Sequence, residues 1–388
     1  METLAIIAPA KVSISNDKIY THFSFGRIVD ELASRFEKVY LCVPGKSDNP
    51  NEIFDYLIQS PNIVLINQSF YNGSSDAIKQ LPSIVKAYYQ ACSRGRNVFV
   101  RGMLPYAGLF YLIAWSKSCK VCHWIIGNPV ALLKSHVRAG KIKDFFSLLY
   151  AWQDRLLTIY GRKLTNGSFI CNGDELGNIY KSPRTVVTVS TTLLEDEFFV
   201  REDTCRNETI RLLYIGFIRP EKGIEYLLEA VGMLRLEKNW KLTIAGPSEQ
   251  FPAYKQKLLA IAQQNKIADK IEWPGYVSYG PEMFGYMRQS DIFVLPTLSE
   301  GTPRVLVEAR ANSLPIVSTN VGGIPTSVQN GWDGLLVNSK DSRALADAIE
   351  QIVYNPQLRQ SLIRNGLTSA RKLTVPCFAD LVCRQFQC

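Results

Sequence analysis

The feature that most restricts the fold is an alternation of short apolar runs with amphipathic runs along most of the 388 residues. In the first half, strands are predicted for LAIIAP, KVYLCVP, VLIN, VFVRG and KVCHWII, and helices for residues 24–35, 81–92 and 107–115. In the second half, strands are predicted for RLLYIGF, KLTIAGP, IEWPGYV, DIFVLP, LPIVSTN and DGLLV, and helices for residues 224–235, 254–265, 282–288 and 304–311. Apolar strands separated by helices indicate an α/β fold with doubly wound parallel sheets.

A polar stretch over residues 195–208 separates the two series. We therefore expect an N-terminal domain over residues 1–200, a C-terminal domain over 201–365, and a final helix in 366–388 that packs back toward the first domain. Two such Rossmann-like domains would face a central cleft. Ligands of these sheets bind beyond the carboxyl ends of the strands, so the chemistry is expected directly after each strand.

Composition narrows the class of protein. Lys and Arg number 44 and Asp and Glu 35, a net charge of +9, but no zinc-finger spacing or basic tail points to nucleic acid. Nine cysteines, scattered and odd in number, favour a reducing, cytoplasmic location. Cys119 and Cys122 form a CxxC whose side chains would lie on opposite faces of a strand, so a zinc site is not expected. The chain has no Asp-x-Asp, so we expect neither a metal nor another cofactor.

One segment departs from the alternation. Residues 141–164 place Phe145, Leu149, Trp152, Leu156 and Ile159 on one helical stripe, within a basic region that runs from Lys134 to Lys163. One interpretation is a core helix with a solvated opposite face. The other is a surface that rests on anionic lipid, at the inner face of a membrane, or that holds a lipid-linked acceptor.

The strongest candidate site follows the strand DIFVLP. Gly301, Thr302 and Pro303 form a strand-to-helix turn, with Thr302 placed to cap the helix and Pro303 suited to its first position. Backbone N–H groups at such a helix start attract phosphate. Glu300 before the helix and Glu308 within it suit sugar hydroxyls. The alternative is that Glu308 only pairs with Arg304.

A second candidate lies in GFIRPEKG, where Gly216 ends a strand and Gly223 opens a helix. Arg219 and Lys222 lie in the turn between them. Two cations beside a helix start can neutralise a diphosphate through charge-assisted hydrogen bonds.

These motifs resemble those of the GT-B-fold retaining glycosyltransferases of the family 4 type (glycosyl transferases group 1). EGTPRVLVE matches that family's E-x7-E signature and GFIRPEKG its G-x-x-R-x-x-K-G loop, and the similarity covers about residues 210–340. The resemblance implies that Arg219 and Lys222 hold the diphosphate of a nucleotide sugar, Glu300 contacts the transferred sugar, and Glu308 contacts the ribose. It further implies donor contacts from Gly216, Tyr276, Val277, Gly301, Thr302, Arg304 and Val305.

The first half resembles the family more loosely. Phe23-Ser24 stands where the family has Gly-Gly, and Ile126-Gly127 where it has His-Gly. Asn128 replaces Asp in what looks like a Gly-Asp-Pro variant and is a candidate catalytic residue. His123, five residues earlier, and His22 are candidates as well, although a lone strand histidine is more often a core residue.

The resemblance implies a retaining, metal-independent glycosyltransferase of hexosyl or N-acetylhexosaminyl type. The acceptor would be a hydroxyl of a glycan or a lipid-linked molecule, in cell-surface polysaccharide or glycolipid biosynthesis. Two alternatives stay open: a nucleotide-sugar epimerase of the same fold, and a catalytically degenerate scaffold at the membrane surface.

Overall fold

The computed structural model describes residues 2–16, 18–46, 54–71, 79–130, 133, 142–189 and 192–386. The chain forms two compact units: an N-terminal unit of Met1–Thr192 with Val375–Cys388, and a C-terminal unit of Leu193–Thr374. The boundaries differ from the expected ones, because residues 193–200 belong to the C-terminal unit and the segment that returns to the N-terminal unit begins at Val375 rather than at residue 366.

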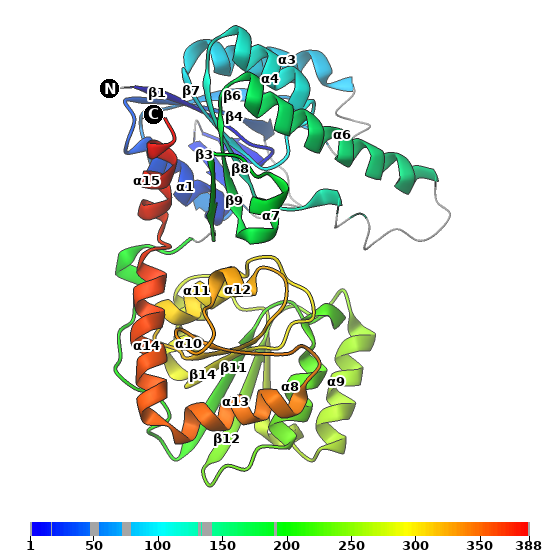
Figure 1. Ribbon diagram of the computed structural model, residues 1–388, viewed down its shortest axis with the longest axis vertical. Helices are drawn as coiled ribbons and strands as arrows, with labels where there is room; N and C mark the ends of the chain where they lie inside the picture. The colour runs from blue at the N-terminus through cyan, green and yellow to red at the C-terminus, as the bar shows by residue number, and fades with distance from the viewer. Residues whose placement is uncertain are drawn as a thin grey trace. The chain divides into compact units, whose positions relative to one another are not determined.

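The sheet of the N-terminal unit is mostly parallel (Figure 1). Its strands are β1 (Thr3–Ile7), β2 (Val12–Ser15), β3 (Lys18–Thr21), β4 (Lys38–Lys46), β5 (Tyr56–Leu57), β6 (Ile63–Gln68), β7 (Asn97–Arg101), β8 (Lys120–Ile125), β9 (Ser168–Asn172) and β10 (Thr185–Thr188). Parallel pairing gives the order β6-β4-β1-β7-β8-β9-β10. The exceptions are antiparallel pairs of β3 with β2 and with β5, at one side of β4.

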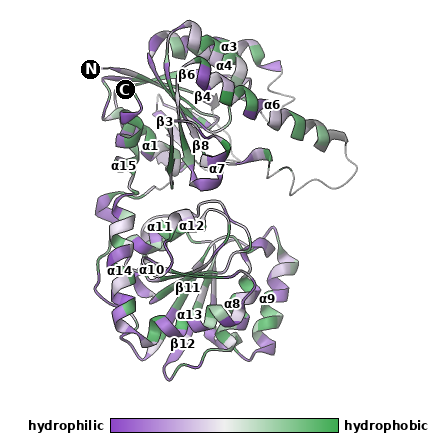
Figure 2. Cartoon of the chain, in the orientation of Figure 1, coloured by the Kyte–Doolittle hydropathy of each residue, from purple (hydrophilic) through white to green (hydrophobic). Residues whose placement is uncertain are grey.

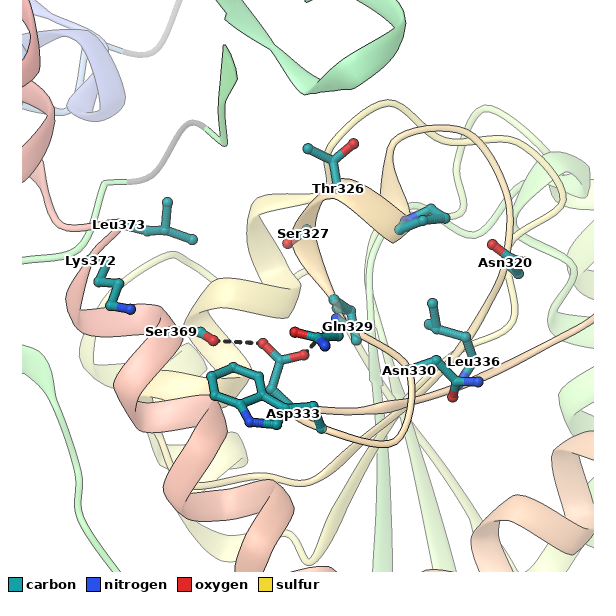
Figure 3. A pocket seen from close by; sticks show the side chains of 13 residues that line it. Asn320, Thr326, Ser327, Gln329, Asn330, Asp333, Leu336, Ser369, Lys372 and Leu373 are labelled. Atoms are coloured by element: carbon teal, nitrogen blue, oxygen red, sulfur yellow. Dashed lines mark hydrogen bonds between the residues drawn. The ribbon is translucent and has the colours of Figure 1, made fainter. Parts of the chain in front are cut away.

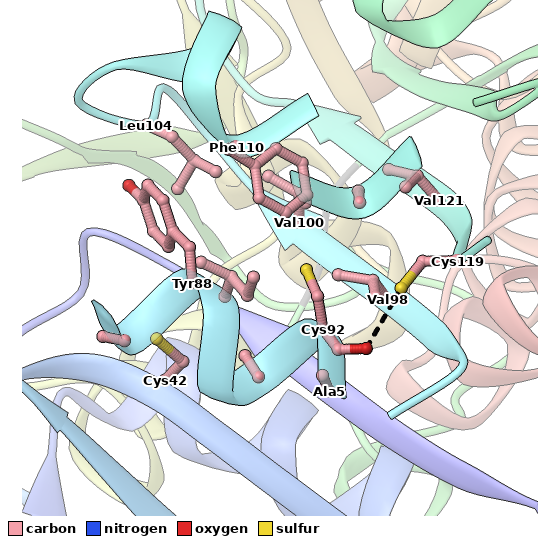
Figure 4. Close-up of a cluster of buried hydrophobic side chains, with 14 of the residues drawn as sticks. Ala5, Cys42, Tyr88, Cys92, Val98, Val100, Leu104, Phe110, Cys119 and Val121 are labelled. Carbon is pink, nitrogen blue, oxygen red and sulfur yellow. Dashed lines mark hydrogen bonds between the residues drawn. The ribbon is translucent and has the colours of Figure 1, made fainter. Parts of the chain in front are cut away.

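Helices cover both faces of this sheet, as alternate side chains of β7 illustrate. Val98 and Val100 lie in the core cluster with Tyr88 and Phe110, which come from α3 and α4 (Figure 4). Phe99 points the other way, with its ring 6.2 Å from that of Phe378 on α15. The helices of this unit are α1 (Phe23–Ala33), α3 (Leu81–Arg94), α4 (Ala107–Ser116), α6 (Ile142–Leu164), α7 (Gly173–Ile179) and α15 (Val375–Arg384).

The sheet of the C-terminal unit is parallel throughout and has the order β13-β12-β11-β14-β15-β16. Its strands are β11 (Thr209–Ile215), β12 (Asn239–Ala245), β13 (Ile271–Gly275), β14 (Ile292–Leu295), β15 (Ile316–Thr319) and β16 (Leu335–Val337). Its helices are α8 (Ile224–Gly232), α9 (Pro252–Gln264), α10 (Pro281–Gln289), α11 (Arg304–Ala311), α12 (Ile324–Ser327), α13 (Ser342–Tyr354) and α14 (Pro356–Arg371), with short 3-10 turns at Glu195–Glu197, Pro220–Lys222 and Ala268–Lys270.

The α/β class with parallel doubly wound sheets is therefore confirmed, and the predicted helices lie within a few residues of the expected ranges. The sequence analysis missed the hairpin β2–β3 and the run β9-α7-β10. These strands are only four or five residues long, and β2, β3 and β10 are largely half-buried, so they lack the continuous apolar character of the central strands.

The helix expected over residues 141–164 is present as α6, but four of the five residues on its predicted core face do not face the core. Phe145, Leu149, Trp152 and Leu156 are exposed, whereas Ile159 packs against a core cluster, and Ala151 and Thr158 are buried. Of the basic region predicted to touch a membrane, residues 134–141 lie outside the described residues. None of the described helices is long and apolar enough to cross a lipid bilayer.

Candidate functional site

The candidate site lies where the strand order of the C-terminal sheet reverses. The chain leaves β11 and crosses to one side, and β14 follows on the other side, so the loops after these two neighbouring strands meet at the carboxyl edge. Such a switch point is where open α/β sheets bind ligands. The two loops are joined directly, because the Leu298 N–H donates to the Glu221 carbonyl over 2.8 Å.

At this edge Lys222 and Glu300 form an ion pair, with Nζ and Oε2 2.5 Å apart. The Lys222 side chain is 7% exposed and that of Glu300 18%. Gly223 lets the chain enter α8 directly after the lysine, because its φ is +61° and a Cβ there would meet the Pro296 carbonyl at 2.4 Å. The structure thus brings together one predicted cation and one predicted carboxylate, which stand 78 residues apart in the sequence.

Arg219, the second predicted cation, is more accessible. Its side chain is 36% exposed, its Nε lies 2.7 Å from an Oε1 of Glu221, and its guanidinium lies 5.2 Å from the centre of the Phe217 ring. Gly216 precedes this turn, and its N–H donates to the Ala245 carbonyl at the end of β12. Arg219 can therefore reach a ligand at the same edge with most of its donors unused.

The helix after Glu300 spans the predicted residues 304–311, but the assignment of its N-cap is wrong by one residue. Pro303 is the N-cap residue of α11, with extended φ and ψ, so Thr302 does not cap the helix and Pro303 is not its first helical residue. Thr302 instead lies beside Gly323, whose N–H donates to the Gly301 carbonyl over 2.9 Å. The first turn of α11, with exposed Arg304 and half-buried Val305, still presents N–H groups that no helix carbonyl accepts.

Glu308, on α11, is only 4% exposed. Burial raises the pKa of Glu308 to about 7, and the charge of Arg304 opposes this increase only in part. Among the residues that the structure describes, no ion-pair partner reaches the Glu308 carboxyl, so the simple pairing with Arg304 is not formed. A buried carboxyl without a cation suits a neutral hydroxyl ligand better than a phosphate.

The predicted base-flanking residues follow β13. The Gly246 N–H after β12 donates to the Gly275 carbonyl over 2.7 Å, so the ends of β12 and β13 are adjacent. Tyr276 is 67% exposed at this edge, whereas Val277 is buried. An exposed aromatic ring next to the carboxyl edge can stack on a planar base.

A separate hollow of about 660 Å³ lies beside α12 and the end of α14 (Figure 3). Asp333 at its floor accepts from Arg310, Ser369 and the Gln329 N–H, so this carboxyl is fully engaged within the protein. The Arg310–Asp333 pair is buried and holds α11 to the loop before β16. We assign it a structural role.

His123, the predicted catalytic histidine, lies in the core of the N-terminal unit and is 2% exposed. Its Nδ1 lies 2.8 Å from the Tyr111 hydroxyl and its Nε2 lies 2.7 Å from the Gly102 carbonyl. Burial lowers the pKa of His123 to about 4, so the ring is neutral near pH 7. Both nitrogens are engaged inside the protein, so this placement supports the core interpretation and not catalysis.

The other N-terminal candidates lie at the surface. Asn128 donates to Glu175 and accepts from Arg155, over 2.7 and 2.6 Å. His22 is the N-cap residue of α1 and is exposed beside the Phe54 ring. The first N–H of that helix, from Phe23, donates to a carboxylate oxygen of Asp55 over 2.7 Å.

The sequence analysis overlooked Thr297, which lies two residues after the end of β14. Its hydroxyl lies 3.0 Å from the carbonyls of both Glu221 and Ser299, and its own carbonyl accepts from Thr319. It therefore fixes the loop that carries Glu300 against the loop that carries Lys222. The signal in the sequence was a threonine placed just after the carboxyl end of a predicted strand.

Comparison with known proteins finds that residues 196–368 match the family model "Glycosyl transferases group 1". An uncharacterized glycosyltransferase of Methanocaldococcus jannaschii is 32% identical over 162 residues, which are 42% of this chain and 43% of that protein. D-inositol 3-phosphate glycosyltransferase of Paenarthrobacter aurescens is 30% identical over 169 residues, 42% and 40% of the two chains. The match thus spans less than half of either relative.

Solved structures resemble the whole chain. Sucrose-phosphate synthase from Thermosynechococcus elongatus has a TM-score of 0.67 at 18% identity, covering 100% of this chain and 99% of that one. Anabaena HepE in complex with UDP-glucose has a TM-score of 0.66 at 14% identity, with 100% and 99% covered. The chain therefore has the GT-B fold of two Rossmann-like domains.

Proposed function

We propose that this chain, whose C-terminal unit matches glycosyl transferases group 1, moves a sugar from a nucleotide-diphosphate sugar to a hydroxyl of a glycan or lipid-linked acceptor. The observation that carries the proposal is the Lys222–Glu300 pair at the switch point of the C-terminal sheet. Similar chains include glycosyltransferases, and one solved structure of the same fold holds UDP-glucose.

In this proposal Arg219 and Lys222 bind the diphosphate. An ammonium group has three donors, so Lys222 can hold Glu300 with one and phosphate oxygens with the others. Glu300 then accepts from hydroxyls of the transferred sugar, Glu308 accepts from the ribose, and Tyr276 flanks the base. The turn of Gly301, Thr302, Arg304 and Val305 lies beside the distal phosphate and the sugar, and Gly216 and Val277 line the donor.

The two cations also supply the catalysis. Negative charge grows on the departing diphosphate as the glycosidic bond breaks, and Arg219 and Lys222 stabilise that charge more strongly in the transition state than in the bound donor. The acceptor hydroxyl attacks from the face that the nucleotide leaves, which gives retention of configuration. The chain has no Asp-x-Asp to hold a metal on the diphosphate, so we propose that these side chains take its place.

The test begins with donor binding. Thermal-shift and calorimetric titrations with UDP, GDP and their hexose and N-acetylhexosamine conjugates should find one family of nucleotides that raises the melting temperature. Arg219→Ala should lower transfer at least tenfold with an unchanged circular dichroism spectrum. The matched control is Arg206→Ala in the same unit, whose side chain is 67% exposed, and transfer should stay within twofold of wild type.

Two results would overturn the proposal. One is the absence of binding by every nucleotide and nucleotide sugar, with transfer unaffected by Arg219→Ala. The other is conversion of the donor to an epimer in the absence of any acceptor, which would make the protein an isomerase.

A further inference from the structure

The helix α6 of the N-terminal unit presents an apolar stripe to solvent. Its members are Phe145, Leu149, Trp152, Leu156 and Tyr160, spaced by four, three, four and four residues and 42% to 64% exposed. Figure 2 shows hydrophobic (green) segments along α6 among polar ones. Isolated exposed apolar residues are common, but a continuous stripe of large ones usually marks an interaction surface.

The orientation of α6 is fixed by the opposite side of the helix. Ala151, Asp154, Thr158 and Gly161 are buried. The ring of Tyr111 on α4 lies so close to Gly161 that a Cβ there would meet it at 2.1 Å. Small and polar residues, together with the half-buried Ile159, thus contact the protein, and the five large side chains of the stripe are left exposed.

The neighbouring helix α4 extends the apolar surface. Leu157 of α6 lies against Gly108 of α4, and the two helices run side by side (Figure 1). On α4, Leu112 and Trp115 lie on the same side as Gly108 and are 52% and 55% exposed. We call the α6 stripe with Leu112 and Trp115 the α4–α6 face.

Charge is distributed unequally between the two units. The sequence of the N-terminal unit holds 23 Lys and Arg against 14 Asp and Glu, an excess of nine, whereas the C-terminal unit holds 21 of each. The whole positive excess of the chain thus belongs to the unit that carries the α4–α6 face. Asp154 of α6 lies on the buried side of the helix, away from the apolar stripe.

The side chains at the edge of the face suit a lipid headgroup region. Lys163 lies over the Tyr160 ring, 5.5 Å from its centre, and Lys117 lies over the Tyr89 ring beyond the end of α4. Trp and Tyr side chains favour the membrane–water interface, and lysines reach outward to anionic headgroups.

We propose that the N-terminal unit docks on an anionic lipid bilayer through the α4–α6 face, with its apolar side chains inserted below the headgroups. Helices of this kind lie in the plane of the interface. A second copy of the chain is the less favourable occupant, since a dimer through this face would bring two units with the same positive excess together. If the proposed function holds, docking would bring the enzyme to a lipid-linked acceptor.

The experiment is co-sedimentation of the full chain with vesicles of phosphatidylcholine alone or of an equal mixture of phosphatidylcholine and phosphatidylglycerol. We expect binding to the anionic vesicles that weakens at high salt, and at least tenfold weaker binding to the neutral ones. Leu149→Glu with Leu156→Glu should reduce binding to anionic vesicles at least tenfold. The matched control is Val200→Glu with Met233→Glu, which places the same charges on exposed apolar positions of the C-terminal unit and should change binding less than twofold.

Three outcomes would overturn the docking. They are no binding to anionic vesicles, equal binding by the two double variants, and a wild-type dimer in sedimentation velocity that Leu149→Glu with Leu156→Glu dissociates. Binding of nucleotide sugar and transfer to a water-soluble acceptor, measured on the same variants, should stay at wild-type level. Loss of donor binding would count against the proposed function, and loss of vesicle binding alone against the docking.

Discussion

The parallel strands of the two units follow the same order, yet the first loop of each is built differently. In the C-terminal unit, β11 leads into α8 through the short turn that carries Arg219 and Lys222. In the N-terminal unit, β1 leads into the hairpin β2–β3 before α1 begins, and the first N–H of α1 is occupied by Asp55. The same topology thus carries the two cations of the proposed anion site in one unit, whereas in the other unit a carboxylate already occupies the start of the first helix.

The two units also differ in their net charge and in the burial of their ion pairs. The C-terminal unit has no net charge and contains buried ion pairs, such as Arg310 with Asp333. The N-terminal unit carries the whole excess, and its described ion pairs, formed by Arg35, are partly exposed. A balanced unit with buried pairs can hold an anion at a defined point, whereas an unbalanced unit attracts an anionic surface as a whole.

The largest expected effect tests the buried pairing of the C-terminal unit. Arg310→Met leaves the carboxylate of Asp333 buried without its cation, and we expect the free energy of unfolding to fall by about 3–5 kcal/mol. Hydrogen exchange in urea should show the loss in peptides of the C-terminal unit and none in the N-terminal sheet. Arg343→Met, in a half-exposed pair of the same unit, should cost less than about 0.5 kcal/mol. Equal losses in the two variants would contradict this account.

The next effect concerns one buried carboxyl group in each unit, that of Glu308 in the C-terminal unit and that of Asp154 in the N-terminal unit. Burial raises the pKa of Glu308 to about 7 and that of Asp154 to about 6. For each carboxyl, the folded state binds more protons than the unfolded state between its ordinary pKa and its raised pKa. The free energy of unfolding therefore falls as pH rises through this window. At pH 8, Glu308→Gln should be more stable than wild type by about 3 kcal/mol, and at pH 4 it should be equal.

Asp154→Asn should have the corresponding effect in the N-terminal unit, at a lower pH. Its window extends from the ordinary value of 3.8 to about 6, against 4.5 to about 7 for Glu308. Urea unfolding at a series of pH values, followed by hydrogen exchange of each unit, would separate the two. Coincident windows, or an undiminished gain at pH 3, would show that burial does not set these pKa values.

A third prediction compares the lysines that follow the first strand of each sheet. Lys222→Gln removes a charge-assisted bond to the diphosphate, and we expect nucleotide affinity to fall by about a hundredfold in calorimetry. Lys11→Gln should leave affinity within twofold, because Lys11 lies over the Phe70 ring, 4.7 Å from its centre. Similar losses in both variants would mean that the two first loops contribute equally to anion binding.

Most of the fold could be predicted because its signals are local. The 3.6-residue spacing and the apolar strands identify helices such as α8 and strands such as β14 without knowledge of the rest of the chain. The contact of Lys222 with Glu300 could be anticipated because both follow strands of one parallel sheet. That Pro303 rather than Thr302 is the N-cap of α11 could not, because the cap depends on a backbone conformation that either residue could have adopted.

The orientation of α6 could not be predicted from the periodicity of its sequence. Periodicity placed Phe145, Leu149, Trp152 and Leu156 on one side of the helix, but it does not say which side of a helix meets the protein. The side that meets the protein is the one that carries Gly161, because this residue is small enough for the Tyr111 ring to approach. Trp152 lies on the exposed side. His123 is the opposite case, since its strand position was predicted and only its contacts with Tyr111 and Gly102 reveal a core role.

The smallest effect is expected for the ion pair that joins α15 to the turn after α1. Arg35 Nε lies 3.0 Å from Asp380, but the two side chains are 25% and 60% exposed, so water screens their attraction. A double-mutant cycle with Arg35→Gln and Asp380→Asn should give a coupling of about 0.5–1 kcal/mol. The same cycle on Arg359 and Asp203, a bidentate pair only 6% and 8% exposed in the C-terminal unit, should give a several-fold larger value. Equal couplings would contradict the difference in ion-pair burial between the units. The expected ratio would mean that α15 is held mainly by apolar packing, in which the Phe378 ring lies 4.5 Å from the Trp124 ring.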